Sequence, residues 1–96
     1  MIDGIGRLSV LIPVYNEGAT IDRILDAVHA VPIPKQVVCV DDASTDGTGE
    51  RLAVLHAAGR IDVLVRHDRN RGKGAAIRTA LAASTGDVVI VQDADL

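Results

Sequence analysis

Two aspartates spaced two residues apart, Asp93 and Asp95, follow an apolar run in the last part of the sequence. Carboxylate oxygens are the ligands that hard divalent cations such as Mg²⁺ and Mn²⁺ prefer. If a strand ends at Asp93, the turn after it can bring both carboxylates toward one cation. Such a cation would offset the charge of a nucleotide diphosphate and stabilise it as a leaving group. The alternative interpretation is a polar turn that ends a strand, because this spacing of aspartates is common.

A second acidic pair, Asp41 and Asp42, follows another apolar run. An aspartate at that place can accept hydrogen bonds from the N–H groups of a base or from ribose hydroxyls. It can equally organise the turn and cap the next helix, a role also open to Ser44 and Asp46. We expect one aspartate to bind a ligand and its neighbours to cap, and the pattern leaves open which one.

Two further polar segments carry candidate binding residues. In the first, Tyr15 is the only aromatic residue of the chain and could lie along a nucleobase, and Glu17 could accept from a ribose hydroxyl. Pro13 stiffens the strand end before them. The second segment, 69–74, combines glycines with basic side chains, a composition that favours phosphate at a helix start. It matches neither a Walker A loop nor G-x-G-x-x-G. The alternatives are a polar loop entering a helix and a solvated basic turn.

The histidines and the single cysteine give no metal-site pattern. His29, His56 and His67 have no spacing typical of zinc ligands, so we expect them at the surface or between helices. Cys39 lies within an apolar run and is expected to be a small core residue. One cysteine excludes a disulfide within the chain.

Apolar runs rich in β-branched residues alternate with helical patterns along the chain. The predicted strands are 8–12, 37–40, 61–65 and 88–91. The candidate helix caps are Thr20 for the first helix and residues 44–46 for the second. This order predicts an α/β fold, a Rossmann-like β-α-β-α-β-α-β parallel sheet with helices on its faces. The second and fourth strands are apolar throughout, which is typical of strands buried on both faces. All four polar segments then lie at one edge of the sheet, where such folds bind ligands.

Length and charge narrow the function classes. A chain of 96 residues is sufficient for one small domain, and its net charge of −3 makes it a poor candidate for general nucleic-acid binding. Five of its ten basic residues nevertheless lie within residues 66–78, which favours an anionic ligand there. No apolar run approaches the length of a membrane helix, and the first residues lack a signal-peptide pattern. We therefore expect a cytoplasmic domain.

Four segments together resemble glycosyltransferase family 2, in the order in which that family has them. They are residues 8–17, 40–48, 70–76 and 93–96, and the resemblance covers about residues 7–96. Gly-Lys-Gly-Ala at 72–75 and Asp-Ala-Asp-Leu at 93–96 look most like the dolichol-phosphate mannosyltransferase and polyprenyl-phosphate glycosyltransferase branch. The resemblance implies a GT-A fold, of which this chain would be the nucleotide-binding half. It also implies inverting transfer of a hexose, mannose or glucose, from GDP-mannose or UDP-glucose to a polyprenyl or dolichyl phosphate.

The resemblance also assigns roles to individual residues. The nucleotide-sugar site would consist of Pro13, Tyr15, Glu17, Asp41, Asp42, Lys73 and Asp93. Within it, Asp42, with Asp41, would contact base or ribose, and Lys73 would lie near the nucleotide. Asp93 and Asp95 would hold Mg²⁺ or Mn²⁺ with the diphosphate and so act as the catalytic residues. A lipid-phosphate acceptor is already anionic at neutral pH, so this chemistry needs no strong general base.

The sequence stops at Leu96, whereas the family continues into an acceptor-binding half. We therefore expect residues 1–96 to be one domain, the amino-terminal nucleotide-sugar-binding part of a longer enzyme that acts at the cytoplasmic face of a membrane. This part alone would be inactive, and its open sheet edge could pair in a homodimer. The alternative function is a non-catalytic nucleotide-sensing or assembly domain that uses the same pocket. A receiver domain is disfavoured because the first strand ends in Pro13-Val14-Tyr15 and no fifth strand is present.

Overall fold

Strands and helices alternate along the chain in the computed structural model, which describes residues 7–94. The elements are β1 (Leu8–Val14), α1 (Ile21–Ala30), β2 (Lys35–Asp41), α2 (Thr48–Ala57), β3 (Val63–Arg66), α3 (Lys73–Ala83) and β4 (Val88–Val91). This order confirms the predicted β-α-β-α-β-α-β arrangement. Among the helices of this part of the chain, none has the length and apolar character needed to cross a membrane.

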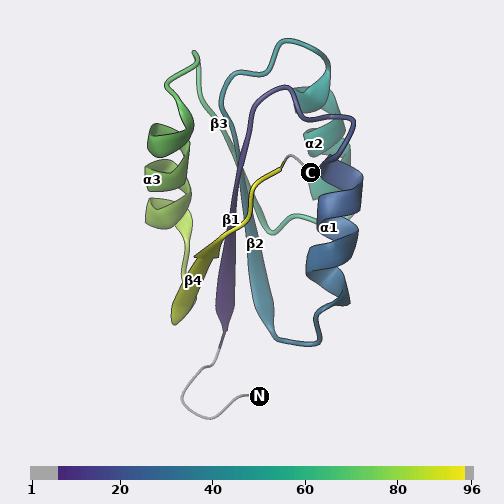
Figure 1. Ribbon diagram of the computed structural model, residues 1–96, viewed down its shortest axis with the longest axis vertical. Helices are drawn as coiled ribbons and strands as arrows, with labels where there is room; N and C mark the ends of the chain where they lie inside the picture. The colour runs from purple at the N-terminus through teal and green to yellow at the C-terminus, as the bar shows by residue number, and fades with distance from the viewer. Residues whose placement is uncertain (1–6, 95–96) are drawn as a thin grey trace.

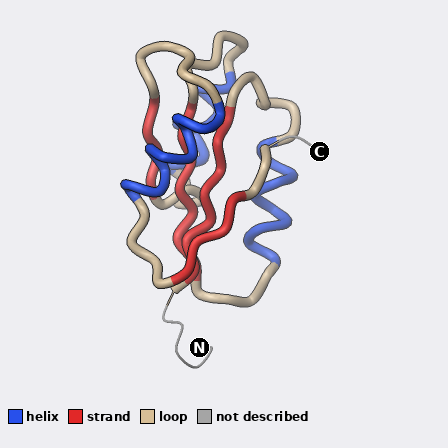
Figure 2. The backbone as a smooth tube through the Cα atoms, turned by 60° about the vertical axis from the view of Figure 1, so that its left-hand side comes forward, coloured by secondary structure: helices blue, strands red, loops and turns tan. Residues whose placement is uncertain are grey.

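The four strands form one parallel sheet in the order β3-β2-β1-β4. Helices α1 and α2 cover one face of the sheet and α3 covers the other (Figure 1). In Figure 2, which is turned by 60° so that α3 comes forward, this helix crosses in front of the strands. Because the strands are parallel, the loops that follow them meet at a single edge, as the sequence predicts.

Side chains that alternate along the strands build an aliphatic core on each face. On β1, Val10 and Ile12 belong to a buried cluster with Leu25 of α1. Leu11, between them in sequence, belongs to a second cluster with Ala76 of α3. Residues that are neighbours in sequence therefore serve opposite layers, and the same alternation separates Asp41, the last residue of β2, from Asp42.

Helix α1 forms because its apolar residues recur at helical spacing. They are Ile21, Ile24, Leu25 and Val28, of which the first three are buried. Thr20 occupies the N-cap position as predicted, but its side chain makes no capping hydrogen bond. Instead, the Thr20 hydroxyl donates to the carbonyl oxygen of Ala94 at 2.5 Å, which joins the start of α1 to the segment after β4.

Strand β4 differs from its prediction. The sequence pattern indicates burial on both faces, but Val88, Val89, Ile90 and Val91 are 39–48% exposed. β4 pairs only with β1 and lies at the end of the strand order, whereas α3 packs mainly against β1 and β2. The prediction was wrong because an apolar sequence shows only that a strand can be buried. Whether it is buried depends on how many layers of the fold cover it.

Candidate functional site

A polar pocket lies at the carboxyl edge of the sheet, between the ends of β1 and β2 and the start of α3. Its volume is about 170 Å³, and it is lined by Pro13, Val14, Tyr15, Glu17, Asp42, Lys73, Ala76 and Asp93. Six of these eight residues are predicted site residues, drawn from four separate segments of the chain. The other two predicted residues are Asp41, which does not line the pocket, and Asp95, which lies outside the described residues.

A larger groove of about 300 Å³ lies between α1, β1 and β4. Its lining is mostly aliphatic, with Lys35 and Gln92 as its polar side chains, and it contains no carboxylate. Ligand sites combine an apolar wall with a few convergent polar groups. We therefore take the smaller polar pocket as the candidate site.

Asp42 forms the inner wall of the pocket and is 3% exposed. Its Oδ1 accepts hydrogen bonds from His67 Nδ1 at 2.8 Å and from the Arg71 main-chain N–H at 2.9 Å. Its Oδ2 accepts from the Gly72 main-chain N–H at 2.8 Å. Burial by itself would raise the pKa of Asp42, but the hydrogen bonds from His67, Arg71 and Gly72 outweigh it and hold the pKa below its ordinary value. The carboxylate is therefore ionised at neutral pH and fixes the loop before α3.

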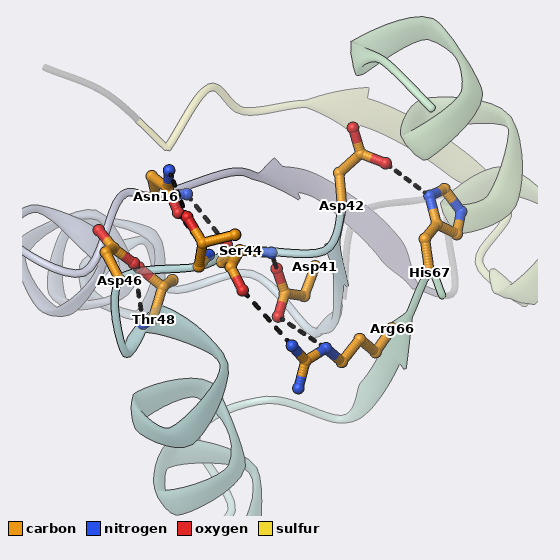
Figure 3. Close-up of polar contacts among 9 residues, drawn as sticks. Asn16, Asp41, Asp42, Ser44, Asp46, Thr48, Arg66 and His67 are labelled. Carbon is orange, nitrogen blue, oxygen red and sulfur yellow. Dashed lines mark hydrogen bonds and ion pairs between the residues drawn. The ribbon is translucent and has the colours of Figure 1, made fainter. Parts of the chain in front are cut away.

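Asp41 points to the opposite face of the sheet, toward α2 (Figure 3). Its Oδ1 accepts from the Ser44 main-chain N–H at 2.9 Å, and its Oδ2 lies 3.7 Å from Arg66 Nε. Gly49 leaves the space that this carboxylate occupies, because a Cβ there would lie 2.9 Å from Asp41 Oδ2. The structure thus assigns Asp41 to the turn and Asp42 to the pocket wall.

The loop that carries Tyr15 and Glu17 is tied to the turn after β2. The Asn16 main-chain N–H donates to Ser44 Oγ at 2.9 Å, and Asn16 Oδ1 accepts from the Thr45 main-chain N–H at 2.8 Å. Figure 3 shows Asn16 beside Ser44 of that turn. These contacts hold the two candidate nucleoside-binding side chains at the rim of the pocket.

Among the predicted caps of α2, Asp46 contacts the first residue of the helix. Its Oδ1 accepts from the Thr48 main-chain N–H at 3.0 Å and from the Thr48 hydroxyl at 2.5 Å. These two hydrogen bonds, the hydroxyl first, lower the pKa of Asp46. Ser44 and Thr45 instead serve the loop contacts described above, so the polar residues of this turn divide their roles.

Lys73 and Asp93 close the outer side of the pocket. Lys73 is the first residue of α3, and its Nζ forms an ion pair with Asp93 Oδ1. Gly72 precedes it with φ of +95°, a conformation that side chains other than glycine rarely adopt. The side chains of Lys73 and Asp93 are 59% and 51% exposed, so both reach solvent at the mouth of the pocket. The mouth of the pocket thus carries one cation and one carboxylate side by side.

The metal prediction rests on Asp93 together with Asp95. Asp93 offers a solvent-accessible carboxylate oxygen, which suits Mg²⁺ or Mn²⁺. Within residues 7–94, no group of three His, Cys, Asp or Glu side chains is placed to hold a metal ion. The donor that is described fits a hard cation, and Asp95 lies outside the described residues.

His67 contacts the pocket residue Asp42, a role that the sequence did not indicate. We expected it at the surface or between helices, but it is 7% exposed and bonded to Asp42 and Thr79. One signal could have indicated it: His67 follows β3 directly, at the same edge as the aspartates that follow β2 and β4.

The sequence profile of glycosyl transferase family 2 matches residues 9–96, which include every residue that lines the pocket. This chain belongs to glycosyl transferase family 2. Two curated members show how much of such a protein it represents. The undecaprenyl-phosphate 4-deoxy-4-formamido-L-arabinose transferase of Pectobacterium carotovorum is 39% identical over 101 residues, which cover 100% of this chain and 31% of that protein. The enzyme of the same name from Pseudomonas aeruginosa strain LESB58 is 40% identical over 97 residues, covering 96% and 29%. The chain therefore spans about a third of the length of these relatives.

Solved structures of similar glycosyltransferases confirm the fold. A mannosyltransferase from Pyrobaculum calidifontis, in complex with GDP-Man and Mn²⁺, matches with a TM-score of 0.84 and 37% identity, covering 93% of this chain and 27% of that one. Glucosyl-3-phosphoglycerate synthase from Mycobacterium tuberculosis, in complex with Mn²⁺, UDP and glucosyl-3-phosphoglycerate, matches with a TM-score of 0.74 and 32% identity, covering 94% and 34%. The architecture is that of GT-A glycosyltransferases, as expected from the sequence.

Proposed function

We propose that residues 1–96 form the amino-terminal, nucleotide-sugar-binding part of a longer metal-dependent glycosyltransferase. The observation that carries this proposal is the convergence of Pro13, Tyr15, Glu17, Asp42, Lys73 and Asp93 on one pocket at the carboxyl edge of a parallel sheet. Membership of family 2 supports it, and so does the likeness to solved structures that are in complex with GDP-Man or with UDP.

Each pocket residue offers chemistry that suits a nucleoside diphosphate. Tyr15 is 43% exposed, so its ring has a free surface along which a base can lie. Glu17 and Asp42 are hydrogen-bond acceptors for base N–H groups or ribose hydroxyls. A carboxylate offers about four acceptor sites, and the three hydrogen bonds to Asp42 leave one for a ligand. Lys73 supplies positive charge for the phosphates.

Asp93 and Asp95 would hold Mg²⁺ or Mn²⁺ and thereby serve catalysis. A bound cation would supply neutralisation of the charge that develops on the departing nucleotide diphosphate. The chain's own part is to hold the Asp93 carboxylate at the pocket mouth through Lys73, and to orient the diphosphate with the Lys73 ammonium.

We propose a lipid phosphate, polyprenyl or dolichyl, as acceptor and a hexose, mannose or glucose, as the sugar transferred with inversion. The lipid acceptor is supported by two relatives named as undecaprenyl-phosphate 4-deoxy-4-formamido-L-arabinose transferases. The hexose is supported by two solved neighbours, which are named for mannosyl and glucosyl compounds. A phosphate oxygen is anionic at neutral pH and attacks without a strong general base. We also propose that the whole enzyme acts at the cytoplasmic face of a membrane, where it would meet a lipid acceptor, and that this part alone is inactive.

The test is calorimetric titration of GDP-mannose and UDP-glucose into the full-length protein, with and without Mn²⁺. We expect metal-dependent binding of one donor, and loss of that binding in Asp93→Asn. The matched control is Asp26→Asn, which removes an exposed carboxylate on α1, away from the pocket. A folded protein that binds neither donor overturns the proposal. Binding without sugar transfer would favour the alternative, a nucleotide-sensing or assembly domain.

The unpaired edge of β4 supports a second proposal, that two copies of the chain associate as a homodimer. In the described part of the chain, β4 pairs with β1 alone and exposes four apolar side chains. Strand edges of this kind favour pairing with another chain. Sedimentation equilibrium of the 96-residue chain should give a dimer mass, and a monomer at all concentrations would contradict the proposal.

A further inference from the structure

His67 connects the end of β3 to Asp42, which lines the pocket, and to α3, which contributes Lys73 and Ala76 to its lining. The residue follows β3 directly, and its ring lies between Asp42 after β2 and Thr79 on α3. Nδ1 is 2.8 Å from Asp42 Oδ1, and Nε2 is 2.8 Å from Thr79 Oγ1 (Figure 3 shows the first contact). Both ring nitrogens are therefore engaged by side chains, and the ring is almost fully buried.

The hydrogen bonds define the orientation of the ring. The Asp42 carboxylate can only accept while it is ionised, so Nδ1 must carry a proton and donate it. The Thr79 hydroxyl can donate to Nε2 or accept from it, so this second contact persists in either charge state of the ring. Thr79 thus holds the ring against Asp42 from the side of α3.

Asp42 passes this orientation on to the loop before α3. The same carboxylate that accepts from His67 also accepts from the main-chain N–H groups of Arg71 and Gly72. Gly72 is followed at once by Lys73, whose ammonium faces Asp93 across the pocket mouth. A change in the direction of the Asp42 carboxylate would therefore move the start of α3 and Lys73 with it.

We propose that His67 is a positioning residue of the nucleotide site. It orients the Asp42 carboxylate, which holds the main chain at 71–72 and so presents Lys73 to the diphosphate of the donor. This inference rests on the proposed nucleotide-binding function. His67 does not line the pocket, so it acts through Asp42 and has no contact with the ligand itself.

Two amide substitutions of His67 distinguish its role in orienting Asp42 from its role in filling the space between Asp42 and Thr79. In His67→Asn the amide nitrogen replaces Nδ1 and can still donate to Asp42. In His67→Gln the amide nitrogen replaces Nε2 and reaches toward Thr79 instead. We expect His67→Gln to weaken binding of the donor, GDP-mannose or UDP-glucose with Mn²⁺, by about tenfold or more, and His67→Asn by about threefold or less. His56→Gln, an exposed change on α2, is the matched control.

The readouts are calorimetric binding to the full-length protein and hydrogen exchange at the Arg71 and Gly72 amides, where His67→Gln should exchange faster than His67→Asn. Equal effects of both substitutions, or wild-type behaviour of His67→Gln, would overturn the positioning role while wild-type binding keeps the proposed function intact. Absence of binding by the folded wild-type protein would overturn both. Should His67→Gln fail to fold, Thr79→Val decides: about threefold weaker binding supports the role, and unchanged binding overturns it.

Discussion

Strands β2 and β4 carry nearly the same sequence and end in very different environments. Residues 37–43 and 88–94 are identical at five of seven positions, and each segment delivers an aspartate to the same edge. The residues of β2 from Val37 to Val40 are 0% exposed, whereas those of β4 are 39–48% exposed. Position in the sheet, and not composition, makes this difference, because β2 lies inside the strand order and β4 at its end.

The two aspartates differ in the same way. Asp42 is buried and accepts three hydrogen bonds from the protein, while Asp93 is half exposed and pairs with Lys73 across the pocket mouth. One strand–aspartate unit thus supplies a carboxylate that the fold needs, and the other supplies one that remains accessible to a ligand. The following predictions test this division.

The largest expected effect is on stability at Asp42. Asp42→Asn removes a buried charge and places a donor NH₂ group among donors, so we expect a loss of about 2–4 kcal/mol in the free energy of unfolding. Asp93→Asn, at an exposed ion pair, should change it by less than about 0.5 kcal/mol. Urea unfolding followed by circular dichroism measures both. Similar losses in the two variants would break the comparison.

Substitutions of apolar residues should likewise lower the free energy of unfolding more in β2 than in β4. Val38→Ala opens a cavity in a fully buried site, and we expect it to cost about 2–3 kcal/mol. Val89→Ala, at a residue that is 41% exposed, should cost less than about 1 kcal/mol. Unchanged denaturant slopes would show that both values report stability. A costly Val89→Ala would mean that β4 is covered in solution, as by a second copy.

At low pH, Asp42→Asn should cost less stability than it does at neutral pH. The pKa of Asp42 is lower in the folded chain than in the unfolded chain, where the pKa of an aspartate is about 3.9. The stability that ionised Asp42 contributes is therefore complete above that value and is lost as the pH falls through the folded pKa. We expect the difference in unfolding free energy between wild type and Asp42→Asn to shrink from pH 6 to about pH 3. The lowered pKa values of Asp22 and Asp46 act equally in both proteins and cancel. A constant difference would contradict the assignment.

The smallest effects concern the alanine that follows each aspartate. Ala43 has φ of +63°, a strained conformation for any residue with a Cβ, so Ala43→Gly should stabilise the fold by up to about 1 kcal/mol. Ala94 is buried in the core, so Ala94→Gly should destabilise it by about 1 kcal/mol. Thermal melting of the two variants gives the signs, and equal signs would show that the two turns are alike.

Much of the fold and of the pocket could be predicted because both depend on local pattern and parallel topology. Alternation of apolar runs with helical spacing predicts the element order, and parallel strands bring their following loops to one edge. That rule suffices to collect Tyr15, Asp42, Lys73 and Asp93 from segments far apart in sequence.

What could not be predicted depends on neighbours in three dimensions. Burial of β4 depends on layers beyond the strand itself, which no run of four residues reports. The choice between Asp41 and Asp42 depends on which of them faces α3, and the pattern of carboxylates is the same for both. His67 was missed because a single imidazole has no motif, and its role arises only when Asp42 and Thr79 lie on either side of it.

Cys39 is a built-in probe of how often the sheet opens. It is the chain's one cysteine, it lies fully buried in the interior strand β2, and burial raises the pKa of its thiol to about 12. A thiol reagent can therefore attack only in the moments when the sheet has opened around β2. The rate of labelling, divided by the rate for the unfolded chain, gives the fraction of time for which the sheet is open around β2. The opening of the sheet can therefore be followed in the 96-residue chain without any engineered probe.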